Sequence, residues 1–388
     1  MKQAYHKEII ALLKKQILAE NKFANIQENY LYESRYFPSI RFDLVVLYEK
    51  EEHYIKEVYY ICSFSTYKGH YHTLREKLMR YNQVIQVGFD NIYLAFKNEK
   101  GELQIVSLRD LDSSMEDIKP RTATISSFSK FYSTIKKWKS EYDSDESRFF
   151  FRGLSKTSYV SLPSIYRNDS LISNEDRLYH EAIRRNPTEF PDEMNTFDKL
   201  VKMQHYELPT RLLDITTNPL VALYFACKDN LRFNGSVLMY PILQEDIQYY
   251  DSDLVSILAN IAKRSKTFTM YPEESEDEWR GFIRDIENES PNAKNLIDKH
   301  IVPGTLCVLP KLNNNRIINQ DGAFFIFGIN HTKKQPARLP DLPNIITIKA
   351  SAKQSILEEL DLMGINEASL FPETDKVMRQ IKEEFCGN

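Results

Sequence analysis

The feature that most constrains this chain is a polar segment that separates two apolar helical patterns. Residues 197–204 follow the i, i+3, i+4, i+7 spacing of a half-buried helix. Pro209 ends that helix, because the residue before a proline is disfavoured in the α region. Asn218-Pro219 then predicts the N-cap and first residue of a second helix. Residues 220–226 are apolar on nearly every side, so this second helix is expected to be buried.

The segment between the two helices is rich in polar side chains, namely His205, Thr210, Arg211, Asp214, Thr216 and Thr217. Next to a buried helix these groups must be paired, because an unsatisfied buried polar group costs about 1–3 kcal/mol. The segment is therefore expected to form a fixed polar loop, with Arg211 and Asp214 as an i, i+3 ion pair. His205 is expected to face a pocket, as a general acid–base or as a partner of a ribose hydroxyl. A histidine bonded to a backbone carbonyl is the alternative.

Length and periodicity predict an α+β protein of two domains. The 388 residues, of which 42% are hydrophobic and 27% charged, have the composition of a folded protein. A small α/β domain is expected over residues 1–115, with strands at 42–48, 58–64, 91–96 and 103–107 and helices at 5–20 and 71–87. Residues 116–147 are polar and predict a linker that contains one helix near 127–138.

A larger mixed α/β domain with a central β-sheet is expected over residues 148–388. Its predicted strands cover residues 148–153, 236–240, 304–309, 322–329 and 344–348. Its predicted helices cover 174–185 and 197–206, parts of 251–299, and 353–363 and 374–384.

Charge and cysteine content exclude several classes of protein. A net charge of −4 argues against a chain built mainly to neutralise phosphates. The four cysteines, which are far apart and have no paired spacing, predict reduced core residues and not disulfides or metal ligands: Cys62, Cys227, Cys307 and Cys386. No apolar run approaches the length of a membrane span and no signal-peptide pattern is present, so a cytoplasmic protein without a membrane partner or metal is expected.

The central polar segment carries a resemblance to a known family. The sequence QHYELPTRLLD followed by NPLVALYFA resembles the central motif of the FRG-domain family, and the tripeptide that names it stands at Phe151-Arg152-Gly153. The resemblance runs roughly from residue 145 to the C-terminus and includes Leu162–Arg167, Glu181, Gln320–Phe324 and residues 364–373. Two residues depart from the pattern: Glu207 stands where the family usually has Gly, and Ile215 where it usually has Trp.

The order of motifs in this region is also similar to that of ADP-ribosyltransferases. In that superfamily an Arg on the first strand holds the dinucleotide, and residues 151–153 match this element. Pro209-Thr210 and residues 222–226 match loosely the Ser/Thr strand and following helix. A late catalytic Glu is missing, since Gln320 and Asp321 stand there.

The resemblance implies that NAD, or a related nucleotide, is the substrate. His205 is then the expected acid–base, and Asp321 or Glu181 would replace the missing carboxylate; an Asp-Gly turn without function is the alternative for Asp321. An internal ion pair with Glu181 or Asp214 is the alternative for Arg152. The residues expected to bind the ligand are Arg152, Gly153, Tyr166, Thr210, Arg211, Asp214 and Gln320.

The N-terminal domain resembles restriction-endonuclease-like proteins in the order of its elements. Asp43 stands where those proteins carry a metal-binding Asp, but Cys62-Ser63-Phe64 stands where the Glu-x-Lys should be. Without those groups the metal site loses a carboxylate and the lysine that polarises water. The domain is therefore predicted to be an inactive nuclease-like module with a weak capacity for nucleic acid, or no relative of nucleases at all.

Three functions remain open on this sequence. The first is an enzyme that acts on NAD or a related nucleotide by transfer or glycosidic cleavage, in a bacterial toxin or in anti-phage defence. The second is a non-catalytic sensor that binds a nucleotide or a protein partner. An active nuclease in the first domain is the least supported, because the Glu-x-Lys is absent.

Overall fold

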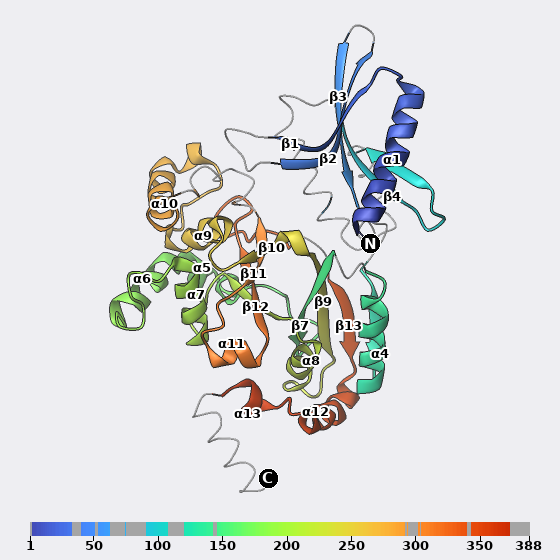
Figure 1. Cartoon of the computed structure of the whole chain (residues 1–388). Helices are drawn as coiled ribbons and strands as arrows, with labels where there is room; N and C mark the ends of the chain where they lie inside the picture. The colour runs from blue at the N-terminus through green and yellow to red at the C-terminus, as the bar shows by residue number, and fades with distance from the viewer. Residues whose placement is uncertain are drawn as a thin grey trace, which may run out of the picture. The chain divides into compact units, whose positions relative to one another are not determined.

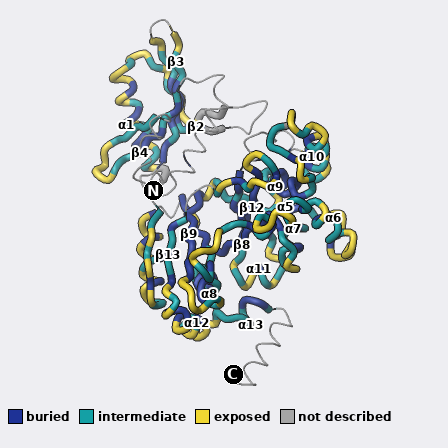
Figure 2. The backbone as a smooth tube through the Cα atoms, turned by 180° about the vertical axis from the view of Figure 1, so that it is seen from behind, coloured by how far each residue is buried: buried dark blue, intermediate teal, exposed yellow. Residues whose placement is uncertain are grey.

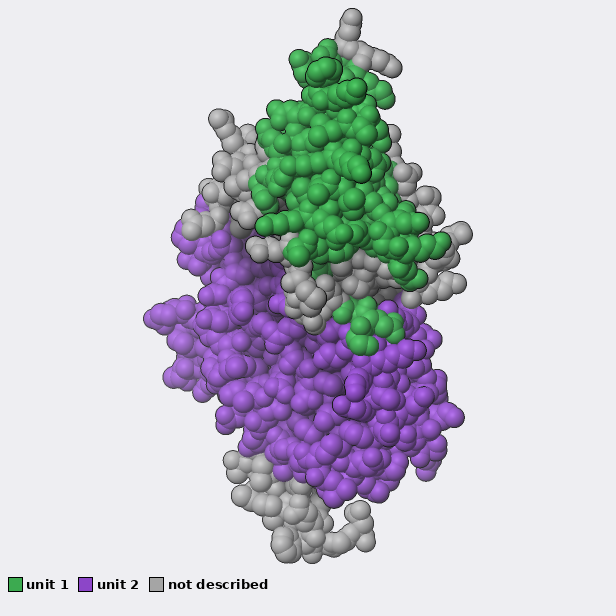
Figure 3. Space-filling view, turned by 45° about the vertical axis from the view of Figure 1, so that its right-hand side comes forward, with its two compact units in different colours: residues 1–119, 140–147 green, residues 120–139, 148–388 purple. Residues whose placement is uncertain are grey.

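A computed structural model describes residues 2–32, 40–50, 53–62, 74, 91–107, 120–142, 146–291, 293, 302, 304–339 and 343–372. The chain divides into two compact units, which Figure 3 colours separately. Unit 1 contains residues 1–119 and 140–147, and unit 2 contains residues 120–139 and 148–388. Each unit has its own sheet of mixed parallel and antiparallel strands, so the α+β prediction is confirmed.

Unit 1 is a five-stranded sheet in the order β1-β2-β3-β4-β5. The strands are β1 (Asn25–Tyr32), β2 (Ile40–Lys50), β3 (His53–Ile61), β4 (Asn91–Lys97) and β5 (Leu103–Ser107). Helix α1 (Lys2–Glu20) packs on the sheet through Ile9, Leu13 and Ile17. The predicted strands are confirmed, whereas β1 was not predicted because its sequence NIQENYLY is mostly polar. The helix predicted over residues 71–87 lies, apart from Leu74, outside the described residues.

Unit 2 is built on an eight-stranded sheet in the order β10-β11-β12-β8-β7-β9-β13-β6 (Figure 1). Its strands are β6 (Thr122–Ile125), β7 (Ser147–Leu154), β8 (Leu212–Thr216), β9 (Gly235–Leu243), β10 (Ile247–Tyr249), β11 (Thr305–Leu309), β12 (Gly322–Phe327) and β13 (Asn344–Ile348). The five strands predicted for this region are present as β7, β9, β11, β12 and β13. Strand β6 lies in the stretch predicted as a linker and pairs in parallel with β13.

The helices of unit 2 flank this sheet (Figure 1). They are α4 (Phe128–Lys139), α5 (Asp169–Ser173), α6 (Glu175–Arg185), α7 (Thr196–His205), α8 (Pro219–Cys227), α9 (Asp253–Asn260), α10 (Glu276–Glu289), α11 (Asn315–Asn319), α12 (Lys353–Leu362) and α13 (Glu367–Leu370). The predicted second helix is confirmed as α8: Pro219 is its first residue, and the Asn218 side chain accepts a hydrogen bond from the Leu220 amide. The helix predicted at residues 374–384 lies outside the described residues.

Strand β8 corrects the prediction of a polar loop after Pro209. Leu212, Leu213, Ile215 and Thr216 are buried, and Asp214 is the exposed residue of the strand. The strand pairs antiparallel with β12 on one side and with β7 on the other. The prediction was wrong because a strand of five residues, with polar neighbours on both sides between Pro209 and the N-cap, is too short to show the alternation of a strand.

The core of unit 2 lies on the two faces of this sheet. On β12, Phe324 and Ile326 pack on one face with α7, α9 and α10, while Phe325 and Phe327 pack on the other with residues of β7, β8 and β9. Figure 2 shows the buried positions concentrated along the central strands. The sheet is therefore a rigid base for the groups that stand at the ends of β7 and β8.

Candidate active site

Three adjoining pockets surround the ends of β7 and β8, and together they are called the cleft. The first, of about 150 Å³, and the second, of about 120 Å³, share Asp214, Ile215, Arg316 and Gln320. The third, called the large pocket, measures about 590 Å³ and shares Arg152, Gly153 and Phe225 with the first. Residues far apart in sequence thus meet along one continuous surface.

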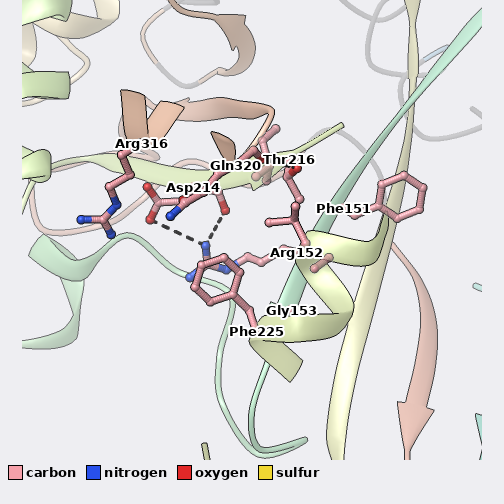
Figure 4. Close-up of a pocket in the computed structure, with 11 residues that line it drawn as sticks. Phe151, Arg152, Gly153, Asp214, Thr216, Phe225, Arg316 and Gln320 are labelled. Atoms are coloured by element: carbon pink, nitrogen blue, oxygen red, sulfur yellow. Dashed lines mark hydrogen bonds and ion pairs between the residues drawn. The ribbon is translucent and has the colours of Figure 1, made fainter. Parts of the chain in front are cut away.

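Arg152 is a largely buried cation of the cleft. Its side chain is 14% exposed, donates a hydrogen bond to the Asp214 carbonyl, and lies 4.0 Å from the Asp214 carboxylate (Figure 4). Burial lowers the pKa of Arg152, and within the described residues its Nε has no hydrogen-bond partner. A buried guanidinium with an unused donor beside a pocket is suited to hold an anionic group. The alternative for Arg152 was an internal ion pair with Asp214 or Glu181. The pair with Asp214 is present at 4.0 Å, whereas in the described part of the chain Glu181 pairs with Arg184 and Arg185.

Asp214 is the carboxylate that lines both small pockets. Its side chain is 64% exposed, although its neighbours along β8 are buried. Gln204 Nε2 donates to Asp214 Oδ1 at 2.7 Å, and Gln204 Oε1 in turn accepts a hydrogen bond from the Thr210 hydroxyl. The carboxylate therefore has a fixed orientation and stays open to a ligand.

His205 ends α7 and lines the second pocket, whereas Arg152 lines the first. The His205 ring packs against Tyr206, with 5.1 Å between the ring centres. The two side chains do not share a single pocket, but their pockets meet at Asp214, Arg316 and Gln320. A ligand that spans both would touch the imidazole and the guanidinium from either side of Asp214.

Helix α7 ends in a motif that explains one departure from the family pattern. Glu207 has a φ of 64°, its amide bonds the Gln204 carbonyl, and the Leu208 amide bonds the Met203 carbonyl. These two bonds form the Schellman motif, whose left-handed position favours glycine. The usual Gly of the family therefore serves to end the helix at His205.

Replacing Glu207 with glycine is expected to stabilise unit 2 by about 1 kcal/mol, because a side chain in the left-handed region costs about that much. Glu207 is exposed, so no buried contact is lost. Thermal unfolding measures the gain. Glu207→Ala keeps the Cβ and is expected to give no gain, and an equal gain from alanine would contradict this account.

Arg211 corrects a second prediction, because its partner is Glu175 and not Asp214. Arg211 is fully buried, donates to both carboxylate oxygens of Glu175, and also donates to the Phe327 carbonyl at 2.7 Å. Burial by itself lowers the pKa of Arg211, but Glu175 and Tyr166 raise it above its usual value. Arg211 and its neighbour Thr210 are core residues and line none of the three pockets.

Of the other predicted ligand-binding residues, two line the cleft and one packs against the core: Gln320 and Gly153 line the cleft, and Tyr166 does not. Tyr166 donates to the Gly328 carbonyl at 3.2 Å, and burial raises its pKa to about 12. Gln320 lines both small pockets, and its Nε2 donates to the Leu370 carbonyl at 3.0 Å. Gly153 lines the first and large pockets and lies against the backbone of α8.

The two carboxylates predicted to replace the missing Glu lie outside the cleft. Glu181 is on the surface of α6, and hydrogen bonds from Arg184 and Arg185 lower its pKa to about 2. Asp321 accepts a hydrogen bond from the Asn218 side chain at 3.1 Å and so supports the start of α8. Neither residue lines any of the three pockets.

Several residues of the cleft were not predicted. Arg316 lines both small pockets, and its guanidinium lies 5.0 Å from the centre of the Phe371 ring. Gln204 and Phe225 were seen only as parts of helical patterns. The sequence could have indicated Arg316, because it stands four residues before Gln320 and such a spacing puts two side chains on the same side of a helix.

In unit 1 Asp43, which stands where nucleases carry a metal-binding Asp, accepts a hydrogen bond from the Ile61 amide at 2.7 Å, and its other oxygen lies 3.6 Å from His6. Cys62 is buried, and residues 63 and 64 lie outside the described residues. Across the described part of the chain, no group of three His, Cys, Asp or Glu side chains is arranged to hold a metal ion. None of the described helices combines the length and apolar character of a membrane span.

Comparison with known families agrees with the position of this site. Residues 147–235 match the family model of the FRG domain, and this range runs from β7 to the start of β9. It contains Arg152, His205 and Asp214. No curated protein and no solved structure matches the chain. The chain therefore contains an FRG domain over residues 147–235, and Arg152 of the cleft belongs to the tripeptide that names this domain.

Proposed function

We propose that the FRG domain binds NAD or a related nucleotide in the cleft and acts on its glycosidic bond. The observation that carries this proposal is the largely buried Arg152 side chain, whose Nε has no hydrogen-bond partner among the described residues, next to an exposed carboxylate. Arg316 lines both small pockets, shares the first of them with Arg152, and has no carboxylate partner among the described residues. Two arginines on either side of a pocket favour a ligand with phosphate groups.

The side chains of the cleft supply the groups that such a reaction requires. When the C–N glycosidic bond breaks, its electron pair leaves with the nicotinamide, and positive charge develops on the ribose. The Asp214 carboxylate would stabilise that charge. Water or an acceptor hydroxyl then attacks the anomeric carbon, and Asp214 or His205 takes its proton.

Nicotinamide release from NAD by the purified protein tests this proposal directly. Arg152→Ala is expected to weaken NAD binding at least about tenfold, because a charge-assisted contact of about 1.5–3 kcal/mol is lost. Asp214→Asn is expected to lower turnover about 100-fold or more while NAD still binds. The matched control is Arg184→Ala, which removes an exposed arginine bonded only to Glu181 among the described residues. Equal nicotinamide release by wild type and Arg152→Ala would reject the proposal.

A non-catalytic nucleotide sensor is the second candidate. The observation that favours it is the position of Glu181 and Asp321, because both lie outside the cleft and leave Asp214 as the carboxylate of the two small pockets. Thermal stabilisation by NAD without nicotinamide release would support this candidate.

If the protein instead consumes NAD, we propose that it acts as a cell-toxic or anti-phage effector. A weak contact of unit 1 with nucleic acid remains a prediction.

A further inference from the structure

The large pocket differs in size from the two small ones. Its volume of about 590 Å³ falls within the range of pockets that hold drug-sized ligands, whereas 150 Å³ and 120 Å³ do not. It is formed by the loop that follows β7 and by the end of α8, where Lys228 and Asp229 line it. The large pocket is therefore the part of the cleft with room for a nucleoside.

Three cations line the large pocket. Arg152 is shared with the first pocket, Arg167 donates from Nη2 to the Leu162 carbonyl at 3.1 Å, and the Lys228 ammonium lies 5.4 Å from the Phe225 ring centre. Among the described residues neither Arg167 nor Lys228 has a carboxylate partner. The one acidic residue of the lining is Asp229, although the whole chain carries a net charge of −4. This local excess of positive charge favours an anionic ligand.

An aromatic ring stands among these cations. Tyr159 lines the large pocket, is 48% exposed, and its hydroxyl accepts a hydrogen bond from Asn230 at 3.4 Å. The Lys156 ammonium lies 5.6 Å from the ring centre. Val160 and Leu162 add apolar surface to the same lining. A planar base would find here a fixed ring to stack on and apolar groups at its edge.

A buried lysine holds the walls of the large pocket together. The Lys353 side chain is fully buried and donates to the carbonyls of Ser155 at 2.8 Å, Asp229 at 2.9 Å and Asn230 at 3.3 Å. One cation thus joins the loop after β7 to the loop after α8. A second link runs from the Asn230 side chain to the Ser155 hydroxyl at 2.8 Å. The pocket is therefore preformed and does not require loop ordering on binding.

We infer that the large pocket holds the adenosine half of the dinucleotide, with the base against Tyr159 and the pyrophosphate at Arg152. This inference rests on the proposed function and adds the direction in which the ligand lies. Arg152 lines both the large and the first pocket, so a pyrophosphate at Arg152 places the other ribose beside Asp214. Arg167 and Lys228 then lie on the adenosine side of the phosphates.

Calorimetric titration with NAD, AMP and nicotinamide mononucleotide tests this direction. Tyr159→Ala is expected to weaken NAD and AMP binding about tenfold and to leave nicotinamide mononucleotide unchanged, because base stacking is lost on the adenosine side alone. Tyr159→Phe keeps the ring and is expected to bind all three ligands as the wild type does. Tyr132→Ala, which removes another exposed tyrosine on α4, is the matched control.

The possible results separate this inference from the proposed function. If wild type binds NAD but Tyr159→Ala binds it equally well, the placement of the adenosine is wrong and the proposed function stands. If Tyr159→Ala weakens all three ligands equally, the placement is also wrong. If wild type binds none of the three, both fail. A thermal melt of each variant shows whether a loss of binding comes from unfolding.

Discussion

Replacing Glu175 with glutamine is expected to lower the free energy of unfolding of unit 2 by about 3–5 kcal/mol. Glu175 is 3% exposed and is the partner of two cations that are fully buried. Arg211 contacts both of its carboxylate oxygens, and Lys333 Nζ lies 3.2 Å from one of them. Glutamine has the same shape but no charge, so two cations would stay in the core without a counter-ion. The cost is the desolvation of those cations and not the loss of one hydrogen bond.

Urea unfolding of the variant measures this loss. Glu181→Gln is the matched control, because Glu181 lies on the same helix α6 and bonds Arg184 and Arg185 at the surface. Exposed ion pairs of this kind contribute little to stability. A Glu175→Gln variant as stable as the control would contradict the role given to the buried cluster.

The same carboxylate predicts how stability changes in acid. Burial alone would raise the pKa of Glu175, but Arg211 and Lys333 lower it below its usual value. The unfolded chain therefore takes up this proton first as the pH falls. The stability that Glu175 contributes is complete above a pH of about 4.3 and declines below it, toward the lowered pKa of the folded state. Glu175→Gln is expected to lose this part of the acid dependence.

The buried cluster also shows where sequence patterns reach their limit. Local periodicity predicted α7 and α8, and an N-cap rule placed Asn218, because neighbours along the chain decide those features. The pairing of Arg211 with Glu175 joins residues 36 apart, and Lys333 lies further still along the chain. The sequence offered Asp214 as a nearer partner for Arg211, since an i, i+3 spacing suits a helix. Arg211 instead directly precedes β8, and along an extended chain the same spacing points two side chains to opposite faces of the sheet.

The residues of the cleft show the same limit: three in local motifs were predicted, whereas others that depend on distant parts of the chain were not. Arg152, Asp214 and His205 were predicted from the central motif and its tripeptide, and all three line it. Asp321 lies outside the cleft, where its side chain accepts a hydrogen bond from Asn218. Glu181 also lies outside it, on the exposed surface of α6 beside Arg184. Arg152 and Asp214 are brought together by the adjacent strands β7 and β8, and His205 ends the helix α7 that precedes β8. Glu181 and Asp321 instead lie on elements whose position depends on the tertiary fold.

The geometry of β7 gives each residue of the tripeptide Phe-Arg-Gly a distinct task. Phe151 is fully buried in the sheet, and Arg152 reaches the cleft. Gly153 lies where β7 meets α8, and the backbone of that helix occupies the space that a side chain would need. The glycine is therefore required for packing, while its neighbour serves the pocket.

Replacing Gly153 with alanine is expected to destabilise unit 2 by about 3 kcal/mol or more. The added methyl group would overlap backbone atoms, which cannot move aside as a flexible side chain can. The added Cβ would overlap the Ala222 carbonyl oxygen and lie 2.7 Å from the Ala226 nitrogen. Moving α8 away would open the wall that carries Phe225, so ligand binding in the cleft should weaken together with stability. Thermal unfolding and NAD titration measure the two effects.

Gly322→Ala supplies the matched control for this substitution. A Cβ at Gly322 would meet its nearest neighbour, the Ile317 carbonyl oxygen, at 3.4 Å, which is ordinary contact. Gly322 starts β12, so both variants add one methyl group to a strand of the same sheet. If packing against α8 is the reason for the glycine, only Gly153→Ala melts at a clearly lower temperature. Equal melting temperatures would mean that α8 moves freely, and the tripeptide would then have no packing role.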